Sequence, residues 1–200
     1  MVADEHEERY VVRPATDGAN PARAAPIPLI VKEVVHARLS ILFRCRLDRS
    51  GAFLAVEHSA FKLFTPASNP LVRLEFDQGQ APASHWHVHA DRTALGSLLN
   101  AAHRQGPHDV ARLHLPAGGT RMRPCLEDFI EFLIRDLGAD WVPGWEGVVA
   151  EGREVWRRRQ IRTAARDAPE DAATTLRALG YAVTAPPAPV AENRVALRGY

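Results

Sequence analysis

The sequence predicts an α+β fold, in which a curved and mainly antiparallel sheet of four or five strands carries helices on one face. Apolar and polar residues alternate in several segments between residues 38 and 89, and this period of two is typical of half-buried strands. Between residues 92 and 179 apolar residues recur at spacings of three and four, as in amphipathic helices. The segments rich in Gly, Pro and Ser between these runs are typical of turns and loops.

The chain of 200 residues is long enough for one domain with its own hydrophobic core. Residues 1–27 are charged and then rich in Ala, Pro and Gly, which predicts a flexible segment with a short ordered piece at residues 9–13. A single domain follows over residues 28–184, and its C-terminal part, residues 145–184, is predicted to be helical. Residues 185–200 are rich in Pro and Ala and are predicted to form a flexible tail.

Composition and charge exclude several classes of protein. The formal net charge of +1 gives no overall attraction to nucleic acid or to anionic membranes, so any such attraction has to be local. The sequence has no run of about 18 apolar residues that would span a membrane, and its N-terminus lacks the apolar stretch of a secretory signal. Cys45 and Cys125 lie far apart, without the spacing of a zinc or redox motif. We therefore expect a cytoplasmic protein with two reduced thiols.

The periodicity assigns the elements in order along the chain. We predict strands at residues 38–47, 53–64, 71–77 and 84–90, with a tight turn at 48–51 and a bend near 59–60. We predict helices at residues 92–104, 124–137, 145–166 and 169–179, with a short strand at 110–115 between the first two. The helix at 124–137 has the clearest apolar stripe, so we expect it to lie across the apolar face of the sheet.

The most unusual segment is Ser84–Ala90, which has a histidine at every second position. Successive residues of a strand point to opposite faces, so His85, His87 and His89 share one face and Trp86 lies on the other. Two imidazoles at this spacing can hold a metal ion together with a carboxylate oxygen, and they can also exchange protons near neutral pH. The alternative is a solvent-exposed strand face that is rich in histidine and has no site.

The strand at 71–77 supplies charged partners for these histidines. In a simple antiparallel register, Asp77 lies opposite His85, Glu75 opposite His87 and Arg73 opposite His89. A shift of one residue would turn these polar groups toward the core, whereas a shift of two would keep them on the same face. The predicted result is a polar cleft of carboxylates, an arginine and imidazoles. Its metal-ligand candidates are His85, His87, His89 and Asp77.

A second candidate site precedes the helix at 124–137. Gly118 and Gly119 allow close approach to the backbone, and Arg121 and Arg123 add positive charge next to a helix start, which suits a phosphate or another anion. The alternative is a plain turn with two solvated arginines. Cys125 lies where arginines and the helix dipole favour its thiolate, or it is simply a packed thiol.

A third candidate is the arginine-rich helix that covers residues 153–166. Its arginines can face RNA or DNA phosphates, or an acidic partner protein. A solvated charged face without a partner is the alternative. This segment has six arginines with few acidic residues between them: Arg153, Arg157, Arg158, Arg159, Arg162 and Arg166.

The block from Leu113 to Asp128, with the pattern Leu-His-Leu-Pro-x-Gly-Gly-x-Arg-x-Arg-Pro, resembles a recurring arrangement in uncharacterised bacterial proteins, where it follows a His-x-His strand and a short helix. More loosely, a strand ending in Arg and acidic residues before a His-rich strand is similar to toxin-like components of small bacterial toxin–antitoxin pairs. The resemblance covers about residues 71–137. It implies a class of possibilities and assigns no catalytic residue.

These patterns lead to three functional expectations. The first is a hydrolase or transferase that acts on phosphate or phosphodiester groups, including RNA, such as a phosphodiesterase or a ribonuclease-like enzyme. Its catalytic candidates are His85, His87, His89, Glu75 and Asp77, and its anion-binding candidates are Arg73, Gly118, Gly119, Arg121 and Arg123. The second is a non-enzymatic regulatory or antitoxin-like module that binds a protein through residues 153–166. The third is a protein that binds a divalent metal ion without turnover.

Overall fold

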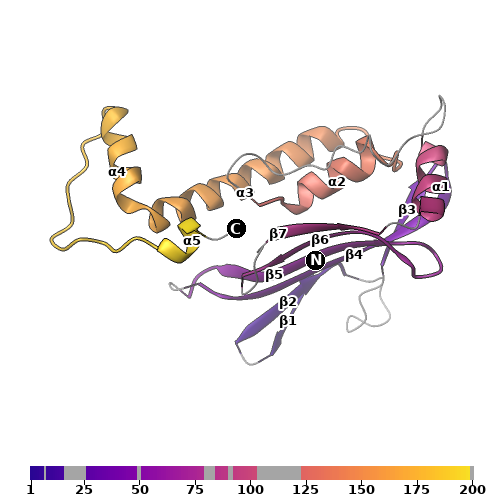
Figure 1. Ribbon diagram of the computed structural model, residues 1–200, viewed down its shortest axis with the longest axis horizontal. Coiled ribbons are helices and arrows are strands. Elements are labelled where there is room, and N and C mark those ends of the chain that lie inside the picture. The colour runs from indigo at the N-terminus through magenta and orange to yellow at the C-terminus, as the bar shows by residue number, and fades with distance from the viewer. Residues whose placement is uncertain are drawn as a thin grey trace.

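The computed structural model describes residues 1–6, 8–15, 26–48, 51–78, 84–89, 92–102 and 123–198, and every structural statement below concerns these residues. They form one seven-stranded sheet and five helices, which confirms the predicted α+β class (Figure 1). The strands are β1 Val2–His6, β2 Arg9–Arg13, β3 Ile27–Val31, β4 Val34–Leu47, β5 Leu54–Phe64, β6 Pro70–Asp77 and β7 Ser84–Val88. The helices are α1 Arg92–Ala102, α2 Leu126–Arg135, α3 Trp145–Asp167, α4 Pro169–Ala178 and α5 Arg194–Arg198.

The sheet is antiparallel at every pairing among the described strands, in the order β1-β2-β4-β5-β6-β7. The long strand β4 pairs with β5 along one edge, and its other edge pairs with β2 near Phe43 and with β3 near Ala37. The register of β4 and β5 shifts between Arg44 and Cys45, opposite Glu57. The bend expected near residues 59–60 therefore lies two residues earlier, as a bulge that leaves Glu57 without a directly opposed residue.

The sheet has more strands than the four or five predicted, because the N-terminal segment contributes β1, β2 and the start of β3. Residues 1–27 were expected to be flexible apart from a short ordered piece at residues 9–13. That piece matches β2, but β1 also pairs with β2 in a hairpin that extends the sheet beyond β4. In β2, Tyr10 lies opposite Cys45 and Val12 opposite Phe43. The local pattern of residues 2–6 is too short and too charged to predict a strand there, and the pairing of β2 with β4 stabilises the hairpin.

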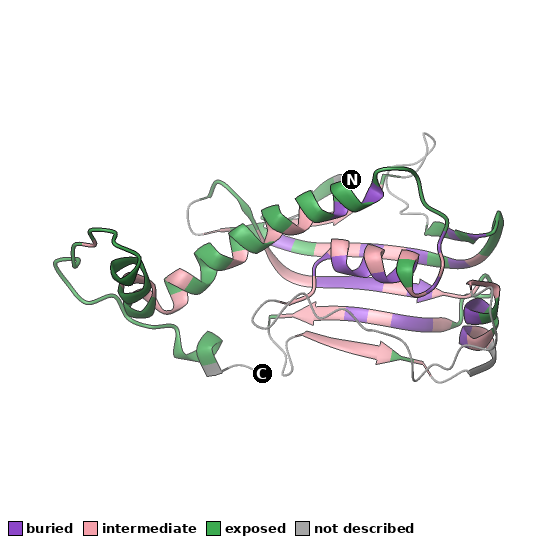
Figure 2. Cartoon of the chain, turned by 90° about the horizontal axis from the view of Figure 1, so that it is seen from above, coloured by how far each residue is buried: buried purple, intermediate pink, exposed green. Residues whose placement is uncertain are grey.

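The hydrophobic core lies between one face of the sheet and the helices α1 and α2, as the buried residues in Figure 2 show. The indole of Trp86 stacks on the ring of Phe129 from α2, with centroids 5.7 Å apart, and Phe61 contacts the same ring at 5.9 Å. The expectation that this helix crosses the apolar face of the sheet is confirmed. The core includes Leu39, Ile41, Phe61, Leu63, Val72 and Leu74 from the sheet, with Leu95, Leu98, Leu99, Phe129, Phe132 and Leu133 from the helices.

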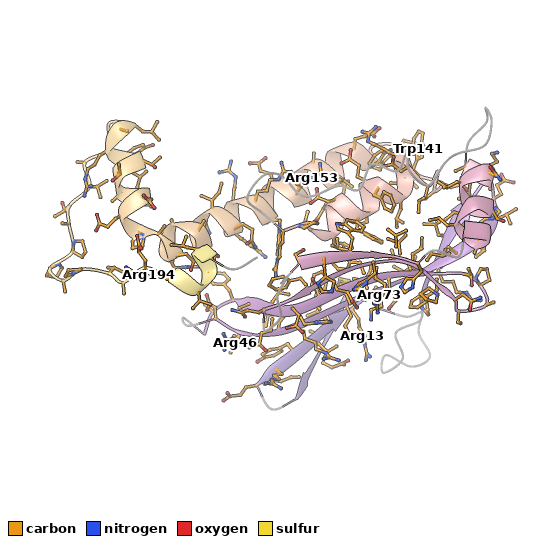
Figure 3. The ribbon with its side chains drawn as sticks, viewed as in Figure 1. Arg13, Arg46, Arg73, Trp141, Arg153 and Arg194 are labelled. Atoms are coloured by element: carbon orange, nitrogen blue, oxygen red, sulfur yellow. The ribbon has the colours of Figure 1, made fainter. Side chains whose placement is uncertain are left out.

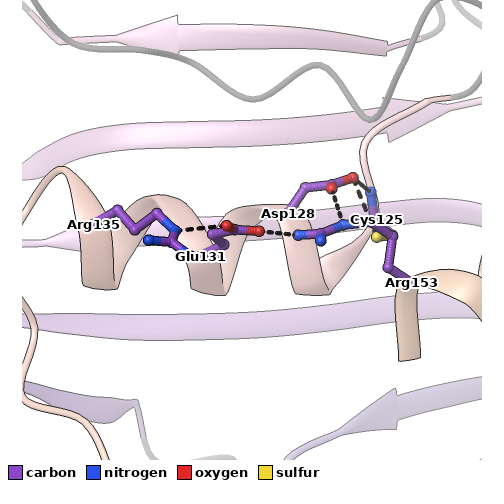
Figure 4. Close-up of polar contacts among 5 residues, drawn as sticks. All are labelled: Cys125, Asp128, Glu131, Arg135 and Arg153. Carbon is purple, nitrogen blue, oxygen red and sulfur yellow. Dashed lines mark hydrogen bonds and ion pairs between the residues drawn. The ribbon is translucent and has the colours of Figure 1, made fainter. Parts of the chain in front are cut away.

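Helix α2 begins at Leu126, two residues later than Pro124 suggested, because Cys125 is its N-cap. The backbone N–H of Cys125 donates to Oδ2 of Asp128 at 2.9 Å, and the thiol lies 3.2 Å from the same oxygen. Asp128 is buried, and its Oδ1 accepts a hydrogen bond from Nε of Arg153 at 2.8 Å (Figure 4). The same guanidinium pairs with Glu131, so Arg153 joins α3 to two turns of α2.

The C-terminal helices extend past the sheet as an arm (Figures 1 and 2). Trp145 and Val149 are the buried residues of α3, and every residue of α4 is exposed or half-buried. The segment predicted as a flexible tail includes α5, and Asn193 ties it back to α3 through two hydrogen bonds to Asp167, at 2.9 and 3.0 Å. The predicted strand at 110–115 lies outside the described residues.

Candidate functional site

The predicted histidine face exists, but its register with β6 differs from the simple register. Glu75 lies opposite His85 and Arg73 opposite His87, which is a shift of two residues from the expected pairing. The polar groups stay on one face, as a shift of two allows. On the opposite face the shift places Trp86 against Leu74, under the ring of Phe129. This aromatic contact in the core explains why the shifted register is preferred.

The face that carries these residues is the one turned away from α2. Pairs of residues directly opposite each other share a face, so Lys62, Arg73 and His87 form one row across β5, β6 and β7. Ala60, Glu75 and His85 form the next row. Figure 3 shows Arg73 on this side of the sheet. We call this surface the open face, and its residues are Arg44, His58, Lys62, Arg73, Glu75, Asp77, His85, His87 and His89.

Two imidazoles converge on one carboxylate oxygen at the centre of the open face. Nε2 of His85 and Nε2 of His87 each lie 3.7 Å from Oε2 of Glu75. The side chain of Glu75 is 13% exposed, that of His85 is 22% exposed and that of His87 is 43% exposed. The three ligand atoms lie within 4.8 Å of one another, so these residues meet a basic requirement of a metal site. We call this group the Glu75 cluster.

Positive charges surround the carboxylate of Glu75. Nζ of Lys62 lies 2.9 Å from Oε1, and a terminal nitrogen of Arg73 lies 3.8 Å from Oε2. Burial alone would raise the pKa of the Glu75 carboxyl, but Lys62, Arg73 and His87 together hold that pKa below its usual value. The carboxylate is therefore ionised at neutral pH, and its two oxygens have different neighbours.

The imidazole of His87 is held in its neutral form. Burial lowers the pKa of His87, and the positive charge of Arg73 and the neighbouring His85 lower it further, against the opposite effect of Glu75. The ordinary value is near ~6.5, so the ring is mostly neutral at pH 7. A neutral imidazole has a free lone pair, which is needed both for binding a metal ion and for accepting a proton.

His89 is the next histidine along the chain after His87 and lies on the same face, beyond the Glu75 cluster. Its ring stacks on that of His87, with centroids 6.4 Å apart, whereas the rings of His85 and His87 meet edge to face at 4.9 Å. The backbone N–H of His89 donates to the carbonyl of Leu71, which extends the pairing of β7 with β6 by one residue. Among the described residues, the group of potential ligands contains His85 and His87 but not His89.

Asp77 is on the open face but has a different partner from the one predicted. Its Oδ2 lies 3.7 Å from Nδ1 of His58, the residue directly opposite on β5. Sequence reasoning missed both His58 and Lys62 as members of this face. His58 and Lys62 are four positions apart in β5, and residues separated by an even number of positions share one face of a strand. Alternation along β5 was therefore the signal that could have found them.

The anion site predicted before the helix at 124–137 is only partly described. Its one described residue, Arg123, does not lie on the open face. Gly118, Gly119 and Arg121 are outside the described residues. The guanidinium of Arg123 lies 3.7 Å from the ring centroid of Phe76 and 4.6 Å from that of Trp156. Phe76 faces the helices, so Arg123 is on the opposite side of the sheet from Glu75. Its burial there lowers the pKa of Arg123 to about 10.

Comparison with known proteins gives no further guidance on this site. No family model matches the chain, and no curated protein or solved structure matches it. In the described part of the chain, none of the helices combines the length and the apolar character needed to cross a bilayer.

Proposed function

We propose that the protein is a hydrolase or transferase that acts on phosphate or phosphodiester groups, including RNA, at the open face of its sheet. The observation that carries this proposal is the convergence of His85 and His87 on one oxygen of Glu75, beside the positive charges of Lys62 and Arg73. Groups that activate a nucleophile and groups that bind an anion are thus next to each other.

Phosphoryl transfer needs both kinds of group. The nucleophile has to be activated, and the negative charge on the transferred group has to be stabilised. The Glu75 cluster supplies the activating groups, and its most exposed member, His87, is the one that a ligand meets first. Lys62 and Arg73 supply fixed positive charge within 4 Å of the same carboxylate, which suits the oxygens of a phosphate group.

The test is turnover of a panel of phosphate monoesters, phosphodiesters and short RNAs by the full-length protein. We expect His87→Ala to reduce turnover by at least about 100-fold, the lower end for a catalytic acid–base or ligand group. His36→Ala, which removes a histidine of β4 outside the cluster, is the matched control and should leave turnover unchanged. Equal turnover by wild type and His87→Ala would contradict the proposal, as would the lack of turnover of every substrate by the wild type.

A second candidate function has its own supporting observation. Five arginines are exposed along α3 where that helix extends past the sheet: Arg157, Arg158, Arg159, Arg162 and Arg166. This charge suits an acidic protein partner, as in a regulatory or antitoxin-like module. Copurification from the native host distinguishes it from an enzyme, because reversing the charges of Arg157, Arg158 and Arg159 should remove a stoichiometric acidic partner. Reversal of the exposed Arg38 and Arg44 on β4 is the control.

A further inference from the structure

The two distances from Glu75 to the imidazoles are equal, and neither is a hydrogen bond. Both are 3.7 Å, whereas a hydrogen bond between a ring N–H and a carboxylate is about 2.7–3.2 Å long. In a tetrahedral zinc site with ligand bonds of about 2.0–2.1 Å, neighbouring ligand atoms lie about 3.4 Å apart. The two separations from Glu75 are therefore closer to those between ligands of one ion than to those of a hydrogen-bonded pair, and the ligand atoms of all three residues lie within 4.8 Å of one another.

We propose that Glu75, His85 and His87 bind one Zn²⁺ ion through Oε2 and the two Nε2 atoms. This goes beyond the proposed function and does not depend on it, because binding can be measured without turnover. Two imidazoles and one carboxylate are a common ligand set for zinc, and three protein ligands leave one position for a water molecule or a substrate oxygen. The cofactor class is a divalent transition metal with a preference for nitrogen ligands.

The two strands place the ligands with little freedom. Glu75 and His85 are directly opposite each other in the register, and His87 is the next residue along the same face of β7. The other face of β7 is fixed by the stacking of Trp86 on Phe129, so the backbone beneath both histidines is anchored in the core. The side chain of His87 is 43% exposed, so it has room to rotate toward an ion at this position.

Lys62 gives the carboxylate a defined orientation. It contacts Oε1 and leaves Oε2 for the metal, as outer-shell partners of metal-binding carboxylates do. Arg73 acts in the opposite direction, because its charge lies 3.8 Å from the ligand oxygen and repels a cation there. Affinity should therefore be moderate, in the micromolar range, and it should increase when Arg73 loses its charge.

The experiment is calorimetric titration of Zn²⁺ into the full-length, tag-free protein, with circular dichroism to verify that each variant folds. We expect one ion per chain. Binding should be lost in His85→Ala and His87→Ala and weakened at least tenfold in Glu75→Gln. The substitution Arg73→Gln should tighten binding roughly three- to tenfold.

His89→Ala is the matched control, because it removes an adjacent imidazole of the same row that is not part of the cluster. It should bind Zn²⁺ as the wild type does. Loss of binding in His89→Ala with no effect of Glu75→Gln would mean that any row of surface histidines binds the ion, and the proposed site would be wrong. Lack of Zn²⁺ binding by the folded wild type would also overturn it, whatever the result of the turnover assay.

Cobalt gives a second readout that depends on geometry. Co²⁺ in a four-coordinate site absorbs visible light far more strongly than hexahydrated Co²⁺ does. We expect the strong absorption in the wild type and in His89→Ala, and its loss in His87→Ala. The weak spectrum of six-coordinate Co²⁺ in the wild type would contradict a tetrahedral site.

Discussion

Nζ of Lys62 lies 2.9 Å from Oε1 of Glu75, so an ion pair links the centres of β5 and β6 on the open face. The pair is only partly exposed, at 32% for Lys62 and 13% for Glu75. It fixes which carboxylate oxygen faces the imidazoles of His85 and His87. Lys62 is thus a positioning residue for the Glu75 cluster.

The coupling between these two residues can be measured by a double-mutant cycle with Lys62→Met and Glu75→Gln. We expect a coupling free energy of unfolding of about 1 kcal/mol, at the upper end for an ion pair with access to solvent. Chemical denaturation of the wild type, both single variants and the double variant gives this value. Strict additivity of the two single substitutions would mean that the ion pair contributes nothing to the orientation of Glu75.

Arg153 is predicted to be the most important polar residue between α2 and α3. It donates to the buried carboxylate of Asp128 and pairs with Glu131 (Figure 4). Arg153→Ala leaves Asp128 buried without its cation, so the free energy of unfolding should fall by about 3 kcal/mol. Thermal and urea denaturation measure this. The control is Arg158→Ala, because Arg158 is exposed and pairs with Glu154 within α3, and its loss should cost less than about 0.5 kcal/mol. Similar losses in both variants would contradict this account.

Stability in acid should depend on Glu131. Burial would raise the pKa of its carboxyl, but Arg135 and Arg153 outweigh burial and lower it. A carboxyl with a lowered pKa stabilises the folded state above its unfolded pKa, and this contribution is lost as the pH falls through the folded pKa. Glu131→Gln should therefore be less stable than the wild type at pH 7, and the difference should shrink below about pH 4.3. Urea denaturation at several pH values tests this, and a difference independent of pH would contradict it.

Gly138 after α2 should tolerate no side chain. Its φ is +68°, and a Cβ there would lie 2.6 Å from Cβ and 2.9 Å from Cα of Ala102 in α1. Gly138→Ala should thus strain the backbone and separate the two helices, with a loss of more than about 2 kcal/mol in the free energy of unfolding. Gly144→Ala is the control. Gly144 also has a positive φ, but a Cβ added there would have no atom within 4 Å, so the decrease in its free energy of unfolding reports backbone strain alone. Equal losses would show that α1 does not pack against Gly138.

Alternation along the chain was enough to predict which residues share the open face. His85 and His87 share a face with Glu75 and Arg73, as the period of two requires. The pairing partner of each residue could not be predicted, because a shift of two residues preserves every face. What separates the two registers is the stacking of Trp86 on Phe129, a contact between residues 43 positions apart that no local pattern reveals.

Other differences between the predictions and the structure also arise from contacts between residues that are far apart in the sequence. The hairpin of β1 and β2 depends on the pairing of Tyr10 and Val12 with β4, and few apolar residues mark it locally. Asp77 pairs with His58, the residue directly opposite on β5, because the shifted register places His85 opposite Glu75 instead. The anion-binding role expected for Arg123 stays a prediction, but its stacking between Phe76 and Trp156 under the helices is a contact that the local sequence does not indicate. The spacing of residues along the chain therefore indicates which face of a strand a side chain occupies more readily than it indicates which residues that side chain contacts.

X-ray absorption spectroscopy at the zinc edge of the zinc-loaded protein tests the Glu75 cluster most directly, because it counts the imidazoles bound to the ion. We predict two imidazole ligands and oxygen ligands at about 2.0–2.1 Å. Three imidazoles around the ion, or a shell of oxygen atoms alone, would contradict the convergence of His85 and His87 on Glu75.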